Sequence, residues 1–564
     1  MIRPTHSEQY TTIRLSYPEH YNGKCPLCNN NVTFQYANGG KLVHCLDRTI
    51  YQITNLYICT NPECKLSNTP FNPTVRFDYG GRSWGADVLR YIAKEFLLIK
   101  MNPKQILDRL MIEYPSFEIS LDSIRRIMDD ILLLKAHRID EHTLEIITNQ
   151  GQILLGLDGQ DPDGNGPSVW LFMDLLSGRV LSTQLFESLN YESLYLYIQN
   201  LLTKYKVPLV GWVSDKQGVL VKCHDTYFKD IPMQYCQFHF LSHLWNHLEC
   251  LDSTIFMPLK AVINKLYIHT SNQEVFFEGK GNISVKEAFK PMDLDFQRMI
   301  KVRNKKFNTL RGVWLYETLS VYLQGMEKTL QKMNSELRAA KIMKNCYEKV
   351  KDIHDHLHET YQDAVQLRDW FESIRSTLAD STFSVEEQKR RCELIEKAIL
   401  SEILRRDPTF CVDACRSFLP NKNNSYISVL GEYLRLWKSY SPGLFQYVHF
   451  PKSIRTNGDL ERTFSVEKTL LVSRAGKGTV SHMVSTRGEA YIRIQRCDPD
   501  ELKRDIILDY EEELVQQLRT ELKSRIKEIT QHWRSMSISY YGYDGVSLTF
   551  DDCLEKSMTK KEVR

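Results

Sequence analysis

The stretch GQILLGLDGQ, residues 151–160, decides the fold that we expect of this chain. Its apolar run is too short for a typical helix and is flanked by glycines, so it predicts a buried strand that ends on Asp158. The stretch VPLVGWVSD, residues 207–215, has the same form and ends on Asp215. If the two strands are neighbours in one sheet, their carboxylates lie side by side, which outlines a metal site.

The segments around these two strands predict an alternation of strands and helices. The runs SVWLFMDLL and RVLSTQLFE are strand-like and are joined by Ser177-Gly178, which indicates a hairpin. A helix at about 191–205 precedes the second acidic strand, and a further helix and the strand IPMQYC follow it. This order is that of a ribonuclease-H-like core: three strands, a helix, a strand, a helix and a strand. In that arrangement the ends of the first and fourth strands, with Asp158 and Asp215, lie together.

A third acid lies far along the chain, in SIRTNGDLERTFSVEK. Asp459 is expected to cap a helix there, and Glu461 to lie in the first turn of that helix. Residues 452–496 carry nine Lys or Arg against four Asp or Glu, an excess that suits contacts with a phosphate backbone. Arg474 and Lys477 are the candidate DNA contacts of this segment.

Length and composition predict a multidomain α+β protein. A chain of 564 residues exceeds the usual size of one core, so three or four domains are expected. The net charge is only +3, which means that a nucleic-acid surface must come from local clusters of Lys and Arg. No apolar stretch approaches the length of a membrane helix, and we expect an intracellular protein. The expected domains are a zinc-ribbon-like module (1–80), a helix-turn-helix (81–140), the ribonuclease-H-like core (141–250 and 451–497), an all-helical insertion (251–450) and a C-terminal helical region (498–564).

Two pairs of cysteines near the start predict a structural zinc site. Cys25 and Cys28 are separated by two residues, and Cys59 and Cys64 by four, with short strand-like runs between the pairs. Two such pairs place four thiolates around one tetrahedral Zn²⁺, which stabilises a module too small for much core of its own. The alternative is four unrelated free cysteines. His44 and Cys45 rank below these four as substitute ligands, because they lie alone in the middle of the module.

Residues 83–137 predict three helices with short joints. Asn102 and Ser120 are the expected N-caps of the second and third helices. In the third, Arg125 and Arg126 fall outside the apolar stripe and are candidates for contact with a DNA groove or its phosphates. An ordinary three-helix bundle with a solvated charged face is the alternative, since Asp129 and Asp130 dilute the basic face.

The long segment 251–450 is dominated by helical periodicity without sustained heptads, so it predicts a packed bundle and not a coiled coil. Just before it, Cys236 is followed by three histidines at four-residue spacing, His239, His243 and His247. They either form a second zinc or DNA site or brace one helix against the sheet. The second interpretation is favoured, because one helix cannot easily wrap a tetrahedral ion.

The order of the motifs, with GLDGQ, WVSDKQG, CQFH, RTNGDLERTFSVEK and SRAGKGTVSH after the paired cysteines and the helices, resembles that of prokaryotic insertion-sequence transposases of the DDE superfamily. It is most similar to the lineage related to the Mutator-like transposases. The resemblance implies that Asp158, Asp215 and Glu461 are a catalytic triad that binds Mg²⁺ or Mn²⁺. It also implies double-stranded DNA partners, namely terminal inverted repeats and target DNA, a homodimer in a synaptic complex, and a cytoplasmic, nucleoid-associated location.

Two other functions stay open. One is a structure-selective DNA nuclease that uses the same sheet without strand transfer, and an assay for joined products separates it from a transposase. The other is a transposase-derived DNA-binding regulator. All three acids are present, so the sequence gives no sign of lost catalysis.

Overall fold

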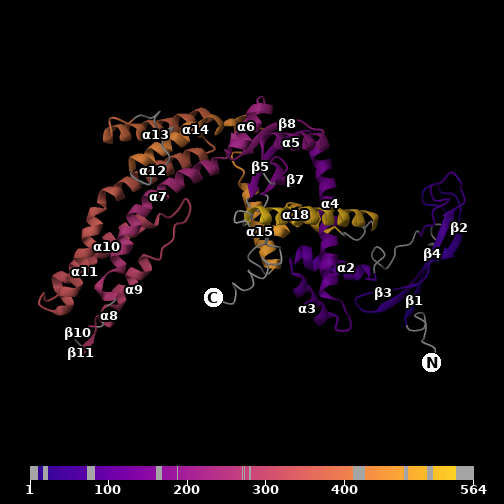
Figure 1. Ribbon diagram of the computed structural model, residues 1–564, viewed down its shortest axis with the longest axis horizontal. Helices are drawn as coiled ribbons and strands as arrows, with labels where there is room; N and C mark the ends of the chain where they lie inside the picture. The colour runs from indigo at the N-terminus through magenta and orange to yellow at the C-terminus, as the bar shows by residue number, and fades with distance from the viewer. Residues whose placement is uncertain are drawn as a thin grey trace. The chain divides into compact units, whose positions relative to one another are not determined.

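The computed structural model describes residues 10–16, 23–72, 83–160, 168–186, 189–269, 271, 273–277, 281–410, 426–475, 481–504 and 512–541 (Figure 1). The chain divides into two compact units. The first comprises Met1–Val210 with Gly458–Arg564, and the second Gly211–Asn457. The fold is mixed α and β with several sheets, as the composition and periodicity predict. Within the described ranges, no helix is both long and apolar enough to cross a membrane.

The first unit begins with a small sheet built around one long strand, β4 (Thr49–Cys59). β2 (Val32–Ala37) and β3 (Lys41–His44) pair with it in antiparallel fashion, and β1 (Thr11–Leu15) pairs in parallel. The register places Val32 opposite Cys59, the last residue of β4. The end of β4 therefore lies beside the start of β2, which follows the first cysteine pair.

Three helical segments follow, as predicted: α2 (Ala86–Ala93), which continues as a π-helical turn over Lys94–Leu98, α3 (Pro103–Glu113) and α4 (Leu121–Gln150). Both predicted N-caps are confirmed. The Asn102 side chain accepts from the Gln105 N–H, and the Ser120 hydroxyl accepts from the Ser123 N–H. The three segments share one apolar core. α4 ends only at Gly151, whose φ of +76° supplies the left-handed C-cap.

The central elements appear in the predicted order: β5 (Ile153–Gln160), β6 (Ser168–Asp174), β7 (Arg179–Phe186), α5 (Tyr191–Tyr205), β8 (Leu209–Ser214), α6 (Gly218–Tyr227) and β9 (Met233–Tyr235). The strands form one sheet in the order β7-β6-β5-β8-β9, and the division between the two units falls within β8. β5, β6 and β7 are antiparallel, whereas β8 and β9 are parallel. The Ile153 N–H donates to the Pro208 carbonyl at 2.9 Å, so β5 and β8 start side by side.

One detail of the predicted first strand is wrong. Asp158 does not end β5, because the strand continues to Gln160 and pairs Asp158 with Leu171 of β6. Gly159, which marks a strand end in the sequence, instead lies under the indole of Trp170. A Cβ at this position would approach the ring to 2.6 Å. The glycine thus permits a close cross-strand contact inside the strand.

The first unit is completed by C-terminal helices: α15 (Gly458–Ala475), α16 (Ser481–Gln495), α17 (Pro499–Lys503) and α18 (Glu512–Tyr541). Leu460 and Phe464 of α15 and Ile492 of α16 pack in one cluster with residues of β6 and β7. α16 and α18 also pack against α4, which α18 crosses in Figure 1. These C-terminal helices therefore cover both β6–β7 and α4.

The second unit is mostly helical, as predicted, and is organised around α7 (Gln237–Asn264). The apolar run after residue 310 divides into α10 (Arg311–Lys332), α11 (Arg338–His356) and α12 (His358–Ala379), which pack on α7 and on one another (Figure 1). A hairpin that the periodicity does not predict interrupts the helices. The remaining elements are 3-10 turns at Tyr267–His269, Ser441–Gly443 and Gln446–His449, the hairpin strands β10 (Glu274–Phe277) and β11 (Gly281–Ser284), and the helices α8 (Val285–Ala288), α9 (Lys290–Met299), α13 (Val385–Arg406) and α14 (Tyr426–Tyr440).

A buried acid links α7 to α10. The Asp252 carboxylate is fully buried and accepts hydrogen bonds from the N–H groups of Gly312 at 2.9 Å and Val313 at 2.8 Å, in the first turn of α10. A Cβ on Gly312 would lie 2.2 Å from the Asp252 carbonyl oxygen, so only glycine allows this approach. Asp252 is a structural helix cap supplied from another helix.

Candidate functional site

Two tight turns bring the four predicted zinc ligands to one end of the small sheet. In the first, the Asn29 N–H donates to the Cys25 carbonyl at 2.9 Å, and Asn29 adopts a left-handed φ of 58°. In the second, the Cys64 N–H donates to the Asn61 carbonyl at 3.0 Å. Because Cys59 ends β4 beside the start of β2, the pairing of the strands places the two turns face to face.

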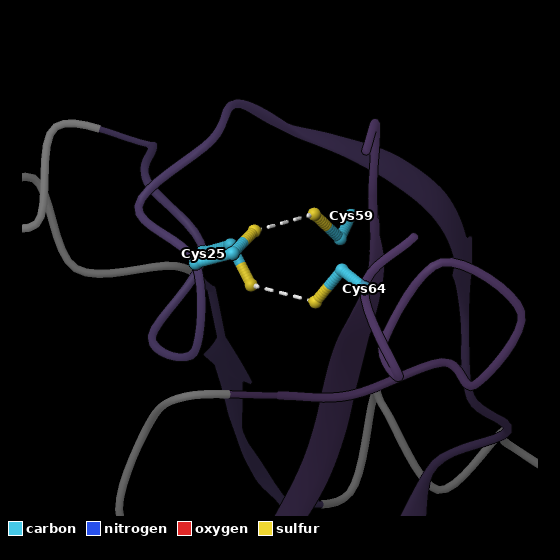
Figure 2. A group of neighbouring side chains, drawn as sticks. Cys25, Cys59 and Cys64 are labelled. Carbon is cyan, nitrogen blue, oxygen red and sulfur yellow. Dashed lines mark hydrogen bonds between the residues drawn. The ribbon is translucent and has the colours of Figure 1, made fainter. Parts of the chain in front are cut away.

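The four sulfurs form a compact group. Cys25 Sγ lies 3.8 Å from Cys64 Sγ, and Cys28 Sγ lies 3.4 Å from Cys59 Sγ; all four lie within 4.8 Å of one another. Figure 2 shows the sulfurs of Cys25, Cys59 and Cys64 turned towards each other. A tetrahedral zinc with Zn–S bonds of about 2.3 Å has S···S edges of about 3.8 Å. The group therefore fits one structural metal ion such as zinc, as the cysteine spacing predicts.

Hydrogen bonds to sulfur favour the thiolate form of Cys28, whereas burial opposes it at Cys59. The Asn61 N–H lies 3.4 Å from Cys59 Sγ, and the Asn30 side-chain amide lies 3.6 Å from Cys28 Sγ. A backbone hydrogen bond from Asn30 lowers the pKa of Cys28 to about 6, whereas burial raises the pKa of Cys59 to about 12. A bound cation would deprotonate the remaining thiols. His44 is not part of the group, since its Nδ1 is hydrogen-bonded to the Thr49 hydroxyl at 3.0 Å.

Asp158 and Glu461 lie on elements that pack together in the first unit. Asp158 is only 8% exposed, and its Oδ1 accepts from the Gly159 N–H at 2.9 Å. Directly opposite residues of an antiparallel pair share a face of the sheet, so Asp158 points to the face of Leu171. Leu171 packs with the fully buried Leu460 of α15, and Glu461 is the next residue. Helix α15, which carries Glu461, therefore packs on the sheet face to which Asp158 points.

The predicted capping role of Asp459 is wrong. α15 begins at Gly458, so Asp459 is already within its first turn, where it is exposed and lies 3.9 Å from the Arg496 guanidinium. The residue before the helix is Asn457, which is buried and whose N–H lies 3.5 Å from Cys236 Sγ. Glu461 does lie in the first turn, as predicted.

β8 ends at Ser214, one residue before the predicted strand end, and Asp215 follows it directly in the second unit. Its Oδ1 is buried, and no hydrogen-bond donor in the described part of the chain reaches it. Burial raises the pKa of the Asp215 carboxyl against the opposing effects of hydrogen bonds from Gln217 and of the nearby His243. A buried carboxylate oxygen without a donor is suited to a cation.

The chain leading to α15 runs beside this acid. The Cys236 N–H donates to the carbonyl of Ser214, the residue before Asp215, at 2.8 Å. The Gln237 N–H donates to the Arg455 carbonyl at 3.1 Å, and Asn457 contacts Cys236 as described above. Within the second unit, the segment that ends one helical turn before Glu461 is therefore fixed next to the end of β8.

The histidines of α7 have different neighbours. The His243 ring lies 6.1 Å from the Tyr440 ring, and His247 Nε2 lies 4.0 Å from a carboxylate oxygen of Glu432. Tyr440 and Glu432 both belong to α14. His243 and His247 thus pack between α7 and α14, and not against the sheet as the bracing interpretation expects.

The predicted DNA contacts differ in their surroundings. Arg125 and Arg126 are both exposed on α4, outside the buried stripe, as predicted. Arg125 donates to Asp122 at 2.8 Å, three residues before it on the same helix. The side chain of Arg474 and the whole of Lys477 lie outside the described residues.

No protein family model and no curated protein matches this sequence. Among solved structures, the chain is similar to the Drosophila P element transposase strand transfer complex, with 12% identity over 78% of this chain and 96% of that chain, and a TM-score of 0.30. A likeness at this level assigns neither a fold nor an activity.

Proposed function

We propose that this protein is a DNA transposase that binds the terminal repeats of its mobile element and catalyses metal-dependent strand cleavage and strand transfer. Asp158, Asp215 and Glu461 would hold Mg²⁺ or Mn²⁺. The observation that carries the proposal is the placement of two acids on adjacent strands: Asp158 lies in β5, and Asp215 follows β8, the next strand of the sheet.

The strand order supports a ribonuclease-H-like core. The sheet has three antiparallel strands and two parallel ones, in the order β7-β6-β5-β8-β9. In chain order, the first strand of this sheet, β5, therefore lies next to the fourth, β8. β5 and β8 start side by side, so their carboxyl-terminal parts, with the two acids, run in the same direction.

The surroundings of Glu461 support its role as the third acid. It follows Leu460, which is anchored on the sheet face to which Asp158 points, and the segment before α15 lies beside the end of β8. A single Glu on a helix is most often a solvated surface residue; the anchoring of Leu460 on the sheet supports a functional role for this one.

Strand cleavage and strand transfer require divalent ions that are held by oxygen ligands. The divalent ions would act as Lewis acids. They would activate water or a 3′-hydroxyl and stabilise the leaving oxygen. Carboxylates are the ligands that Mg²⁺ and Mn²⁺ prefer, and the buried oxygen of Asp215 without a donor fits that use. The protein side chains would fix the positions of the ions and exclude bulk water from Asp158 and Asp215.

The zinc module and the three helices α2 to α4 would bind the element ends, because an exposed pair of arginines lies on the third helix of that group. A homodimer would hold two ends in a synaptic complex.

The experiment is an assay for cleavage and joining with DNA that flanks the gene. Full-length protein with Mg²⁺ or Mn²⁺ should cut at the borders of inverted repeats and join the released 3′ ends to a target plasmid. Cleavage without joined products would instead indicate a nuclease. Binding without cleavage at any divalent ion would indicate a regulator and would overturn the proposal.

A further inference from the structure

We propose that a groove between α4 and the C-terminal helix α18 binds the phosphate backbone of duplex DNA, with Arg126 and Lys523 as the direct contacts. This inference rests on the proposed function, and it gives the C-terminal region a role in DNA binding. The groove lies within the first unit and has a volume of about 820 Å³. Arg126 and Leu133 line its α4 side, and Lys523 and Ile526 line its α18 side.

The charges of the groove favour an anionic partner. Its lining contains four cations, Arg126, Arg487, Arg519 and Lys523, but only two carboxylates. Asp129 accepts two hydrogen bonds of 3.0 Å from the Arg487 guanidinium, and the buried Asp130 is paired with Arg519. Both carboxylates are therefore neutralised. Within the part of the chain that the structure describes, neither Arg126 nor Lys523 belongs to an ion pair, so these two carry the excess positive charge.

The same ion pairs make the groove rigid. Arg519 belongs to α18 and Asp130 to α4, and one turn before Arg519 the buried Val515 packs into the core shared with α2, α3 and α4. Arg487 of α16 pairs with Asp129, the residue next to Asp130 on α4. Lys523, one turn after Arg519, is thus presented opposite Arg126 by packing that exists before a ligand binds. Such preorganisation lowers the entropy cost of binding.

The remaining lining suits a phosphate backbone. Ser123, in the first turn of α4, supplies a hydroxyl, and His44 and Trp84 lie at the groove with ring centroids 5.6 Å apart. Phosphates in protein–DNA complexes are contacted mainly by Arg, Lys, Ser and helix amino-terminal turns, while a neighbouring helix face reads the bases. Arg125 lies next to Arg126 on the exposed surface of α4, beside the groove. These features favour duplex DNA over an acidic polypeptide.

The test measures binding of the full-length protein to a short DNA duplex of arbitrary sequence over a series of salt concentrations. Each phosphate contact contributes about 0.9 to the slope of log affinity against log salt. Lys523→Ala and Arg126→Ala should each reduce the magnitude of this negative slope by about 1. Lys503→Ala is the matched control, because Lys503 is an exposed lysine of α17 outside the groove; its slope should equal that of the wild type. Lys523→Arg should retain the wild-type slope.

Three outcomes separate this inference from the proposed function. If the wild type binds the duplex but both groove variants keep its slope, the groove inference is wrong and the proposed function stands. If the wild type does not bind duplex DNA, the proposed function fails and the groove inference fails with it. The third outcome is that polyglutamate of equal charge displaces the duplex, and that Lys523→Ala and Arg126→Ala lose affinity for both polymers equally. The groove would then recognise acidic chains in general, and its assignment to DNA would be overturned.

Discussion

The four cysteines and the three acids are two candidate metal-binding sets that are assembled in opposite ways. The cysteines lie within one segment of the chain, and two turns and one strand pairing bring their sulfurs within 4.8 Å of one another. The acids lie at positions 158, 215 and 461 and belong to both compact units. Local geometry thus determines the first set, whereas the second depends on the packing of distant segments.

This difference determines how each set responds to substitution. The cysteine module has only a small apolar core, with Val43 and Ile50 as its best-buried residues, so its metal would contribute much of its stability. The acids lie on elements that are held by a sheet and by apolar clusters. Their replacement should impair chemistry and leave the fold intact.

The largest effect is expected from removal of the thiolates. A structural zinc contributes about 10–16 kcal/mol to the folding of small zinc modules, so Cys25→Ser/Cys59→Ser should lose bound zinc and unfold residues 23–72. Metal analysis and hydrogen exchange of those residues would measure this. Cys250→Ser, at an exposed cysteine of α7, is the control and should keep its zinc. Equal protection of the module in the presence and absence of a chelator would contradict the structural role of the metal.

Replacement of the acids should have the next largest effect, on rate and not on stability. Asp158→Asn, Asp215→Asn and Glu461→Gln each remove a charge that the cations require, so cleavage and joining should fall by roughly 10²–10³-fold or more. DNA binding and the melting temperature should change little. A double variant should cost little beyond a single one, because the three groups act as a unit. Additive losses would indicate that the acids do not share one site.

Asp252 provides a contrast with the three candidate catalytic acids, because it is a buried acid with no expected part in the chemistry. Asp252→Ala leaves two N–H groups of α10 without their acceptor, and it should destabilise the second unit by about 2–4 kcal/mol. Chemical denaturation would measure the loss. Asp252→Asn keeps one acceptor oxygen and should retain part of the stability. Cleavage at a temperature where the variants are folded should match the wild type.

Much of this fold follows from local signals in the sequence. The N-caps Asn102 and Ser120, the hairpin at Gly178 and the cysteine turns are set by short-range hydrogen bonds and backbone preferences, so the sequence predicts them. The strand that precedes Asp215, β8, is also predicted, from its short apolar run. The sequence does not predict how far β5 extends, because a glycine such as Gly159 commonly ends a strand. Only the position of Trp170 in the structure shows why β5 continues past Gly159.

The long-range contacts could not be predicted in this way. Asp129 and Asp130 weaken the basic face of α4 in the sequence, whereas in the structure Arg487 and Arg519 neutralise them from helices more than 350 positions away. No local pattern encodes these partners. The one available signal is the amphipathic segment 512–541, in which Val515, Arg519 and Lys523 recur at four-residue spacing on one helical face.

The smallest expected effect concerns the choice between two neighbouring acids. Asp459 is exposed, lies within the first turn of α15 and is 3.9 Å from Arg496, so its contribution is a weak surface ion pair and a favourable position near the helix amino terminus. Asp459→Asn should therefore cost less than about 1 kcal/mol of stability and leave cleavage near the wild-type rate. Glu461→Gln, two residues on, should abolish cleavage, because Glu461 follows the Leu460 anchor on the Asp158 face of the sheet. Parallel measurement of both variants by thermal melting and by the cleavage assay decides between them. Loss of cleavage in Asp459→Asn with retention in Glu461→Gln would move the third metal ligand by half a helical turn, onto a side chain that the structure directs to Arg496.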